Sequence, residues 1–570
     1  MKYKKILSTV LAFALCLSAL AGCNAQKDDN SQSDSGQSSQ SGEKTDYSDA
    51  KQIVLSERGI TVDGKTVAEG EEAGGVSVGG EIIYYHNMDS YESGNIYGEG
   101  GDGDKHTEEE AAAHTLVTIT EAGTYRISGT LSRGQLAVDL GEDAVSDPSA
   151  VVTLVLDGAD ITCEVAPAVI FYNVYECSDS SVDTKGIVDT SAAGAVVVIA
   201  DGSENHINGS YVAKIYKDNT EQKKLAKYDG AFYSKRTMNI NGGAEGSGKL
   251  YIEAENEGLD SELHLTINGG NIYINSRDDG INTNEDNISV TTVNGGYLYV
   301  NGGLGAEGDG IDSNGYITIN GGTVLAIANG KTGDGGIDAD LDITINGGVV
   351  TAFGSRNDSV SENSGQNCME LTFSGNKTAA QGISVKDSSG NAVIEAVCER
   401  EFSSVTLSSP ELEQNVDYSV YVDGVKQAYT AVGVEAGPGG MNFGGFGEKI
   451  EFKDPIVTEL PDGFEEWIKS DDNIPDNIRE WLEDISRSLT GQPIETPRPV
   501  EPKLETEESA GSGDEQMSTM GQPPENNGNQ PPEKPDGGSA DGENEANSLK
   551  ASDVFVLTGV RTSFVGVADA

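Results

Sequence analysis

The sequence predicts an all-β protein built as a solenoid, in which coils of about 26 residues stack on one another. Asn-Gly-Gly recurs in register at Asn241, Asn268, Asn294, Asn320 and Asn346, with spacings of 27, 26, 26 and 26. Short runs of alternating apolar residues flank most of these turns, and no repeat unit has the 3.6-residue period of a helix. A constant period of this length indicates stacked units that share one core.

Alternation within each unit predicts which side chains face the core. Successive side chains of a strand point to opposite faces, so Ile272 and Ile274 should lie inside and Tyr273 outside. By the same rule we expect these inside: Leu298, Val300, Val324 and Ala326. Tyr299 and Leu325 should then lie outside.

Composition limits the partners of the chain. Its 570 residues include 94 acidic and 37 basic side chains, for a formal net charge of −57. Nucleic acid and anionic membrane surfaces are poor partners for such a chain, because phosphate binding needs clustered Lys and Arg. The charge suits a protein that binds cations, or that binds anions through bridging cations.

The N-terminus has the pattern of a bacterial lipoprotein signal. Three lysines precede an apolar run, and Leu20-Ala21-Gly22 leads directly into Cys23. The pattern implies that Cys23 is acylated, so that a lipid anchor alone holds the protein at the extracellular face of the membrane. An ordinary secretory signal is the alternative.

The chain divides into segments by composition. We expect the following: a lipoprotein signal peptide at 1–23, a flexible tether at 24–50, the solenoid at 51–435 with clear repeats at 229–354 and a cap at 355–435, a Gly-rich linker with short helices at 436–490, a disordered acidic and Pro-rich tail at 491–550, and an apolar terminal segment at 551–570. The terminal segment could be a docking strand, and the sequence indicates no partner for the tail.

Cysteine spacing gives no metal signature. Beyond the signal peptide the chain has Cys163, Cys177, Cys368 and Cys398, whose spacings match no zinc pattern. An exported chain permits disulfides, so the pairs Cys163–Cys177 and Cys368–Cys398 stay open against free thiols.

Acidic and amide side chains recur at fixed offsets from a Gly-apolar-polar signal. Residues at equivalent offsets stack about 4.8 Å apart on a parallel solenoid, where carboxylates repel unless a cation lies among them. Ca²⁺ takes six to eight oxygen ligands in irregular geometry. The candidate calcium ligands are Glu257, Asp260, Glu262, Asp278, Asp279, Asn282, Asn284, Asp309, Asp312, Asn314, Asp334, Asp338 and Asp340. The alternative is a solvated acidic edge in which these residues only make turns.

Three tyrosines should form a line on the outer surface. Tyr299 follows Tyr273 at the spacing that separates the turns, and aligning Gly248 with Gly270 adds Tyr251. Flat exposed aromatic rings can stack on sugar rings, so this line is a candidate polysaccharide-binding site. Plain β-propensity is the other explanation.

With these residues, the chain resembles the carbohydrate-binding-domain family of Gram-positive surface proteins. Besides the repeats, the resemblance is carried by residues 119–125, 154–161 and 229–235. It implies a right-handed, single-stranded parallel β-helix similar to pectate lyases. It also implies calcium on the helix surface and binding of cellulose or of acidic pectic polysaccharide such as polygalacturonate.

Four functions follow as hypotheses. The first is non-catalytic, calcium-assisted binding of plant cell-wall polysaccharide at the cell surface, for which no catalytic residue is assigned. A polysaccharide lyase would need a basic residue near the acids, and the candidates are Arg277, Lys331 and Arg356. A polygalacturonase-like hydrolase would need a tight pair of carboxylates. The fourth is a structural or adhesive spacer that calcium only stiffens.

Overall fold

The structure is a computed structural model that describes residues 47–86, 97, 98, 100, 101, 103–178, 186–216, 224–433 and 551–570. The expected signal peptide with Cys23, most of the tether, the linker with short helices and the Pro-rich tail lie outside these residues. In the described part, α1 (Glu108–Ala112) and the 3₁₀ helix η2 (Glu142–Ser146) are short, and the other elements are strands. The all-β class is therefore confirmed. No helix in these ranges is long and apolar enough to cross a bilayer.

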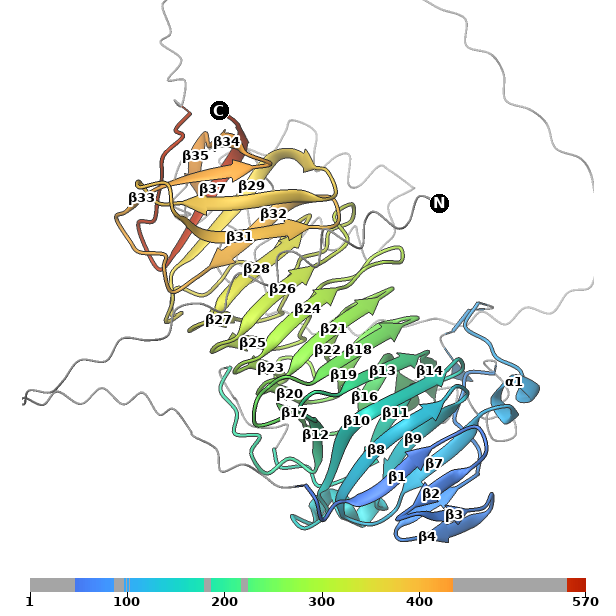
Figure 1. The fold of residues 1–570 in the computed structure, drawn as a ribbon. Helices are drawn as coiled ribbons and strands as arrows, with labels where there is room; N and C mark the ends of the chain where they lie inside the picture. Colours follow the sequence, from blue (N-terminus) through green and yellow to red (C-terminus); the bar gives the residue numbers. More distant parts are fainter. Residues whose placement is uncertain are drawn as a thin grey trace, which may run out of the picture. The chain divides into compact units, whose positions relative to one another are not determined.

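Three columns of parallel strands carry the repeats (Figure 1). The first column holds the strand that leads into each Asn-Gly-Gly turn, and the second holds the strand that follows it. The first column contains β12 (Ala195–Ile199), β17 (Met238–Gly242), β20 (His264–Ile267), β23 (Val290–Val293), β25 (Tyr316–Ile319) and β27 (Ile343–Ile345). The second contains β13 (Glu204–Gly209), β18 (Lys249–Ala254), β21 (Asn271–Ser276), β24 (Tyr297–Asn301), β26 (Thr323–Ile327) and β28 (Val349–Gly354).

The third column holds the Gly-apolar-polar signals in its later coils. It contains β7 (Thr115–Ile119), β9 (Gly134–Asp139), β11 (Val169–Asn173), β16 (Gly230–Ser234), β19 (Glu257–Ser261) and β22 (Ile281–Thr283). Beyond β22 the column continues as single parallel bridges, from Ile281 to Ile311 and from Ile311 to Ile337.

The strand register confirms the period. In the first column Ile267 pairs with Val293, Val293 with Ile319, and Ile319 with Ile345, so that each step equals the spacing of the turns in the sequence. The residues predicted to face inward are also buried: Ile272 and the five others named with it are 0–1% exposed. The pattern of the sequence therefore predicts both the stacking and the faces of the strands.

The second glycine of the repeated turn is required by backbone geometry. Gly270, Gly296, Gly322 and Gly348 have φ between 87° and 96°, a region that residues with a Cβ rarely adopt. A Cβ on Gly296 would also lie 2.5 Å from the carbonyl oxygen of Gly270 in the coil before it. Gly is thus needed here both for the turn and for the close stacking of coils.

The asparagine of the turn links each coil to the next. Its Nδ2 donates to Oδ1 of the preceding copy, from Asn268 to Asn241 at 2.9 Å, from Asn294 to Asn268 at 2.8 Å, from Asn320 to Asn294 at 2.9 Å and from Asn346 to Asn320 at 2.8 Å. This asparagine ladder satisfies side-chain donors and acceptors along the stack, and a residue without an amide could not continue it.

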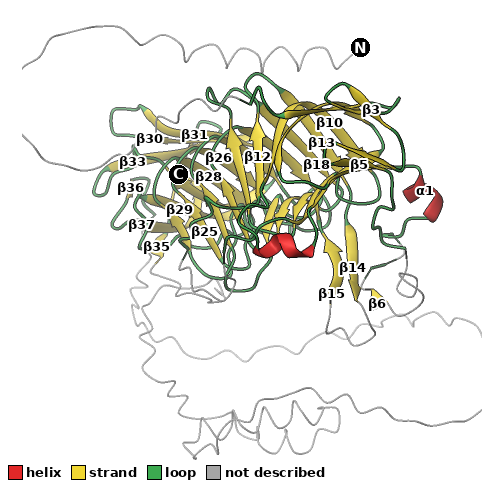
Figure 2. Cartoon of the chain, turned by 90° about the horizontal axis from the view of Figure 1, so that it is seen from below, coloured by secondary structure: helices red, strands yellow, loops and turns green. Residues whose placement is uncertain are grey.

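Antiparallel strands and irregular coils precede the clean repeats. Their strands are β1 (Lys51–Leu55), β2 (Ile60–Val62), β3 (Lys65–Val67), β4 (Glu71–Ala73), β5 (Val76–Val78), β8 (Gly123–Leu131) and β10 (Val152–Cys163). β1, β8 and β10 pair in parallel, whereas β2 to β5 form antiparallel pairs. A separate hairpin, β14 (Val212–Tyr216) with β15 (Lys224–Tyr228), pairs with β6 (Tyr97–Gly98) and is seen beside the stack in Figure 2.

The C-terminal end of the stack meets a mostly antiparallel sheet. This cap contains β29 (Cys368–Lys377), β30 (Gln381–Lys386), β31 (Ala392–Cys398), β32 (Phe402–Ser408), β33 (Asp417–Val422), β34 (Val425–Ala428), β35 (Ala431–Gly433), β36 (Phe555–Val556) and β37 (Arg561–Asp569). β32 pairs with the last coil strand, β28. β37 lies between β29, to which it is parallel, and β35, to which it is antiparallel. The apolar terminal segment is thus a strand within the cap.

The whole sheet is mixed, because antiparallel strands flank the parallel columns at both ends. The right-handed sense of a parallel β-helix stays a prediction. Cys163, Cys177, Cys368 and Cys398 are all free thiols in the described part of the chain. For Cys163, burial raises the pKa of the thiol to about 11, so this thiol stays protonated at neutral pH.

The docking of β37 can be tested at Phe564. Its side chain is fully buried, with ring centroids 4.8 Å from Tyr429 and 5.0 Å from Phe555. Phe564→Ala should lower the free energy of unfolding of the cap by about 3–5 kcal/mol, the usual cost of removing a buried Phe ring. Chemical denaturation followed by fluorescence measures this, with Val554→Ala, at a residue that is 37% exposed, as the control. Equal effects of the two variants would contradict the docking.

Candidate functional site

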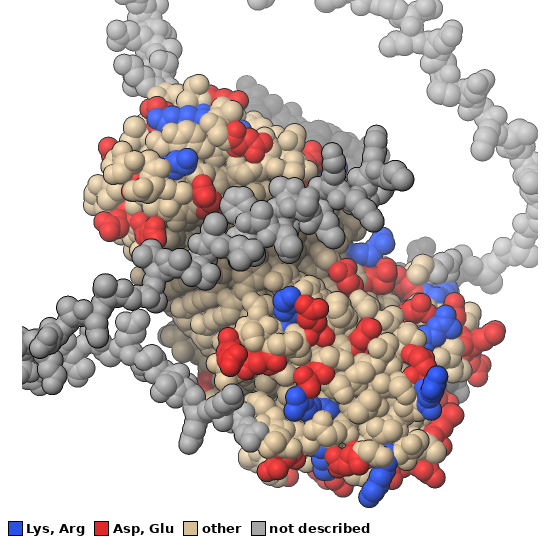
Figure 3. Space-filling view, viewed as in Figure 1, with Lys and Arg blue, Asp and Glu red and all other residues tan. Residues whose placement is uncertain are grey.

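The predicted acidic residues stack on the third column. Asp260 pairs in register with Asn282, and the bridges through Ile311 and Ile337 bring Asp312 and Asp338 into line. We call these four residues the acidic column. On the face shown in Figure 3, by contrast, acidic and basic side chains are interspersed rather than gathered in one patch.

Burial changes along the acidic column. Asp260 is fully buried and Asn282 is 7% exposed, whereas Asp312 and Asp338 are partly exposed. The buried end lies near hairpin β14–β15, whose Tyr228 packs against Tyr233 with ring centroids 5.2 Å apart. Because Tyr233 is in register with Asp260, the hairpin reaches the first position of the column. The column therefore has a covered end and an accessible end.

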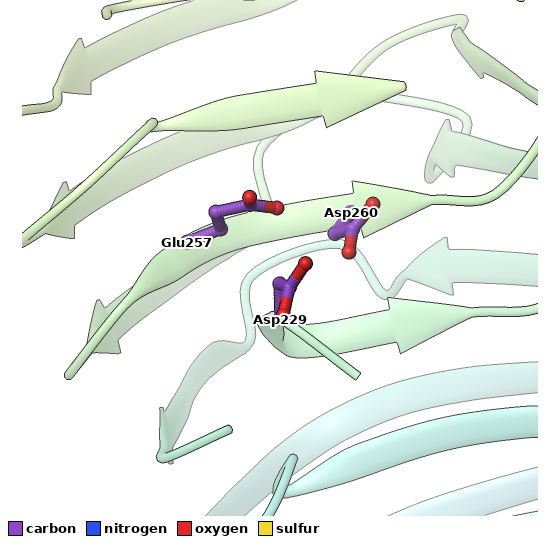
Figure 4. Close-up of side chains that lie close together, drawn as sticks. All are labelled: Asp229, Glu257 and Asp260. Carbon is purple, nitrogen blue, oxygen red and sulfur yellow. The ribbon is translucent and has the colours of Figure 1, made fainter. Parts of the chain in front are cut away.

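At the covered end, three carboxylates point toward one another (Figure 4). Asp229, Glu257 and Asp260 form what we call the closed cluster: they are 4%, 5% and 0% exposed, and one oxygen from each lies within 4.8 Å of the others. Lys227 Nζ on β15 lies 2.5 Å from Asp229 Oδ2. Burial, reinforced by the neighbouring carboxylates, raises the pKa of Glu257 and Asp260 well above the usual range.

Some oxygens in and beside the closed cluster have a hydrogen-bond donor, and others have none. Asn282 Nδ2 donates to Glu257 Oε1 at 3.2 Å, and Asn284 Nδ2 donates to Asp260 Oδ1 at 2.8 Å. Glu257 Oε2, Asp260 Oδ2 and Asn282 Oδ1 are buried without a hydrogen-bond partner among the described residues. A buried oxygen without a donor is costly, and carboxylate and amide oxygens are ligands that Ca²⁺ prefers. The donor set therefore fits a calcium ion.

A second group, the open cluster, lies at the accessible end. One carboxylate oxygen from each of Asp309, Asp312 and Asp338 lies within 4.8 Å of the others, and all three residues are partly exposed. Burial and nearby carboxylates raise the pKa of Asp309 to about 8, of Asp312 to about 7 and of Asp338 to about 9. For Asp338 a hydrogen bond with Asp358 adds to the shift. The protein therefore supplies too little positive charge and too few hydrogen-bond donors to stabilise all three carboxylates in their ionised form.

The other predicted calcium ligands do not connect the two clusters into one continuous row of metal sites. Asp279 and Asp334 accept backbone N–H donors from Asp309, at 2.7 Å, and from Gly308, at 2.8 Å. Burial is also the main cause that raises the pKa of Asp278, to about 6. The remaining three are not members of either cluster: Glu262 accepts a hydrogen bond from Tyr233, Asn314 donates to Asp286, and Asp340 is exposed.

The repeat pattern in the sequence did not identify Asp229 and Lys227 as candidate site residues. Asp229 precedes its strand as Asp-Gly-Ala-Phe, one residue longer than the acid-Gly-apolar signal of Glu257-Gly258-Leu259. Lys227 belongs to a hairpin outside the repeat. The basic residues considered for a lyase instead form surface ion pairs: Arg277 with Glu255 at 3.9 Å, Lys331 with Glu401 at 3.3 Å and Arg356 with Asp358 at 3.6 Å.

The predicted line of tyrosines lies on the second column. Tyr251 and Tyr273 stack with centroids 4.9 Å apart and planes at 16°, whereas Tyr273 and Tyr299 are 6.4 Å apart and tilted by 39°. His206 extends the line, stacking on Tyr251 at 4.9 Å and 9°. We call these four residues the aromatic ladder. His206 is exposed and the tyrosines are half-buried. Because His206 and Tyr273 cover the two faces of Tyr251, the stacked part of the ladder presents mainly ring edges to solvent.

Removing open-cluster carboxylates should weaken stabilisation by calcium. A ligand that binds only the folded state stabilises it by about 2.7 kcal/mol at 100 times its Kd. We expect Ca²⁺ to raise the melting temperature of the wild type, and Asp312→Ala with Asp338→Ala to lose at least half of that rise. The matched control is Glu411→Ala with Glu413→Ala, which removes two exposed acids from the cap. Wild-type melting temperatures that are equal in Ca²⁺ and in chelator would contradict the prediction.

The open cluster should also respond to pH. Its carboxyl groups have a raised pKa in the folded state, so in chelator the folded protein holds protons that the unfolded chain loses above its ordinary pKa near 3.8. The stability that these groups contribute is present at low pH and declines as pH rises toward 8 or 9. Melting temperatures in chelator from pH 5 to 9 should fall more steeply for wild type than for Asp312→Asn with Asp338→Asn. Parallel curves would contradict this.

Comparison with known proteins bears on the class of ligand. Residues 113–396 match the family model described as carbohydrate-binding domain-containing protein. A carbohydrate-binding domain-containing protein of Acetivibrio thermocellus is 29% identical over 159 residues, which are 28% of this chain and 44% of the relative. The chain thus spans less than half of the curated relative that it matches.

A solved structure described as the polysaccharide lyase-like protein from C. thermocellum, gadolinium derivative, is 18% identical, with a TM-score of 0.29 over 52% of this chain and 92% of that one. At that score the likeness is loose. The resemblance expected from the repeats is confirmed in part: residues 113–396, which include both acidic clusters and the aromatic ladder, match the model of the carbohydrate-binding domain-containing proteins.

Proposed function

We propose that this protein binds plant cell-wall polysaccharide, cellulose or polygalacturonate, without catalysis and with the help of calcium. The family match over residues 113–396 supports carbohydrate binding in general. The observation that carries the proposal is the aromatic ladder, because its rings are stacked in register on the outer side of the strands and remain partly accessible.

The ladder suits a long, repeating ligand. His206, Tyr251 and Tyr273 follow one another at 4.9 Å with nearly parallel planes, so a sugar chain laid along the stack would meet one ring per coil. Because neighbouring rings cover one another's faces, the contacts open to a sugar are the apolar ring edges and the tyrosine hydroxyls, which offer hydrogen bonds. A single exposed ring would contribute little, whereas a row of rings adds contacts along the chain.

The open cluster supplies the calcium part of the proposal. A protein with a net charge of −57 repels an acidic polysaccharide unless cations lie between them. Asp309, Asp312 and Asp338 are partly exposed, so a calcium ion held there could keep coordination positions for carboxylates of the ligand. The closed cluster, being buried, would hold an ion without offering it to a ligand.

The same proposal places the protein at the outer face of a bacterial membrane, held by a lipid on Cys23. The lipobox pattern at Leu20-Ala21-Gly22-Cys23 supports this location. Labelling with a fatty-acid analogue tests this location. We expect the wild type to take up the label, and Cys23→Ala to lose the label and to be released from the membrane.

Tyr273→Ala should weaken polysaccharide binding at least tenfold, because Tyr273 lies between Tyr251 and Tyr299 and its loss interrupts the ladder. That change equals about 1.4 kcal/mol. The measurement is retention on insoluble cellulose and on immobilised polygalacturonate, in Ca²⁺ and in chelator. Tyr421→Ala, which removes a partly exposed tyrosine on the cap, is the matched control.

The same incubations separate the other functions. Retention without new products supports binding alone. New unsaturated ends would instead indicate a lyase, and new reducing ends without unsaturation a hydrolase. Equal retention of Tyr273→Ala and Tyr421→Ala would exclude the aromatic ladder as the binding site. If the wild type is not retained on either polymer, the structural or adhesive spacer is the remaining hypothesis.

A further inference from the structure

We propose that a pocket beside the covered end of the acidic column binds one acidic sugar residue through direct contact with Arg236 and Lys235, without a metal ion. This extends the proposed function to a second site with a different chemistry. The pocket has a volume of about 300 Å³. Its lining comes from five separate segments: Glu176 and Ser178, Ala226 to Tyr228, Lys235 and Arg236, Glu262 and Leu263, and Glu285.

Stacked coils build the pocket at the corner between the third and first columns. Lys235 and Arg236 connect β16 to β17, and Glu262 and Leu263 connect β19 to β20 one coil later. The backbone at Arg236 is fixed because its carbonyl oxygen accepts hydrogen bonds from Ser234 Oγ at 2.7 Å and from Ser261 Oγ at 3.0 Å. The position from which the Arg236 side chain extends is therefore set by two coils.

Three basic side chains converge on this pocket, in a chain where acids outnumber bases by 94 to 37. Lys227 is engaged with Asp229, and Lys235 Nζ lies 5.8 Å above the ring of Tyr228. Arg236 forms no ion pair with any residue in the described ranges, and its Nε is buried without a hydrogen-bond partner. Arg236 also lines the pocket, and a guanidinium whose charge is not paired by a carboxylate of the described residues can bind an anionic ligand there.

Two of the three glutamates in the lining are already used by the protein. Glu176 accepts N–H donors on both oxygens, from Ser178 at 3.0 Å and from Thr237 at 2.8 Å. Glu262 accepts from the Tyr233 hydroxyl. Glu285 is exposed and its carboxylate makes no hydrogen bond or ion pair with the described residues, so it can accept hydrogen bonds from hydroxyl groups of a ligand.

The lining therefore complements a ligand with one carboxylate and several hydroxyls. Arg binds carboxylates with two parallel hydrogen bonds, which a neutral sugar cannot match. Tyr228 and Leu263 add an apolar wall for a sugar ring. A volume at the lower end of the usual range for ligand pockets limits the occupant to about one or two sugar rings. These properties describe an acidic sugar, as a free monomer or as a residue of a chain.

The test is a calorimetric or NMR titration of the whole mature protein with D-galacturonate in chelator, beside D-galactose and acetate. We expect galacturonate to bind at least tenfold more tightly than either of the others. Arg236→Gln should weaken galacturonate binding at least tenfold, and Arg236→Lys, which keeps the charge but not the planar fork, should give an intermediate affinity. Arg277→Gln, an exposed arginine paired with Glu255, is the matched control.

Other outcomes overturn the proposal. The proposal is wrong if galactose or acetate binds as tightly as galacturonate, or if galacturonate does not bind in chelator. It is also wrong if the Arg236→Gln protein keeps the wild-type melting temperature and the wild-type affinity. If Arg236→Gln does not fold, the affinities of Arg236→Lys and Arg277→Gln for galacturonate are compared instead. A weaker affinity of Arg236→Lys supports the proposal, and equal affinities overturn it. Because the titration uses a monomer without calcium, its failure is separate from a failure of retention on polysaccharide in calcium. A titration with digalacturonate then tells a free monomer from a residue within a chain.

Discussion

The parallel register between coils is the constraint on which the other features of this protein depend. From β20 to β26, the strands of the first and second columns advance by the same number of residues per coil, so a residue type at one offset becomes a line of that type along the stack. Apolar residues form the core in this way, asparagines form a ladder of amides, and tyrosines form a row of rings. The glycines with positive φ keep the turns identical, which keeps the lines straight.

The same register forces acids together, and the protein compensates them in different ways along the column. At the covered end, Asn282 and Asn284 from the next coil supply amide donors, and Lys227 adds a positive charge. Toward the accessible end the carboxylates of Asp312 and Asp338 face one another with raised pKa values and fewer donors. Protons or a cation must complete the balance there, which couples pH and metal to the same groups.

Sequence periodicity predicted most of what the repeat contains and little of what lies outside it. The inward residues follow from alternation and period, and the stacking of Tyr251 on Tyr273 follows from the alignment of Gly248 with Gly270. His206 was missed because its coil has no Asn-Gly-Gly turn to set the alignment. Arg236 and the pocket were missed because a pocket arises where several segments meet, and no single segment has a pattern that reveals it. The partners of the last strand were likewise unpredictable, since an apolar run does not specify its neighbours.

The position of β37 has a consequence for the order of assembly. Gly433 and Ser563 are partners in adjacent strands of the cap, although the whole Gly-rich and Pro-rich part of the sequence lies between them along the chain. A ribosome must therefore synthesise the chain as far as β37 before that sheet can be completed, whereas the coils ahead of it contain all of their own strands much earlier. The coils can thus form during synthesis, and the C-terminal end of the stack stays without its full cover until β37 emerges.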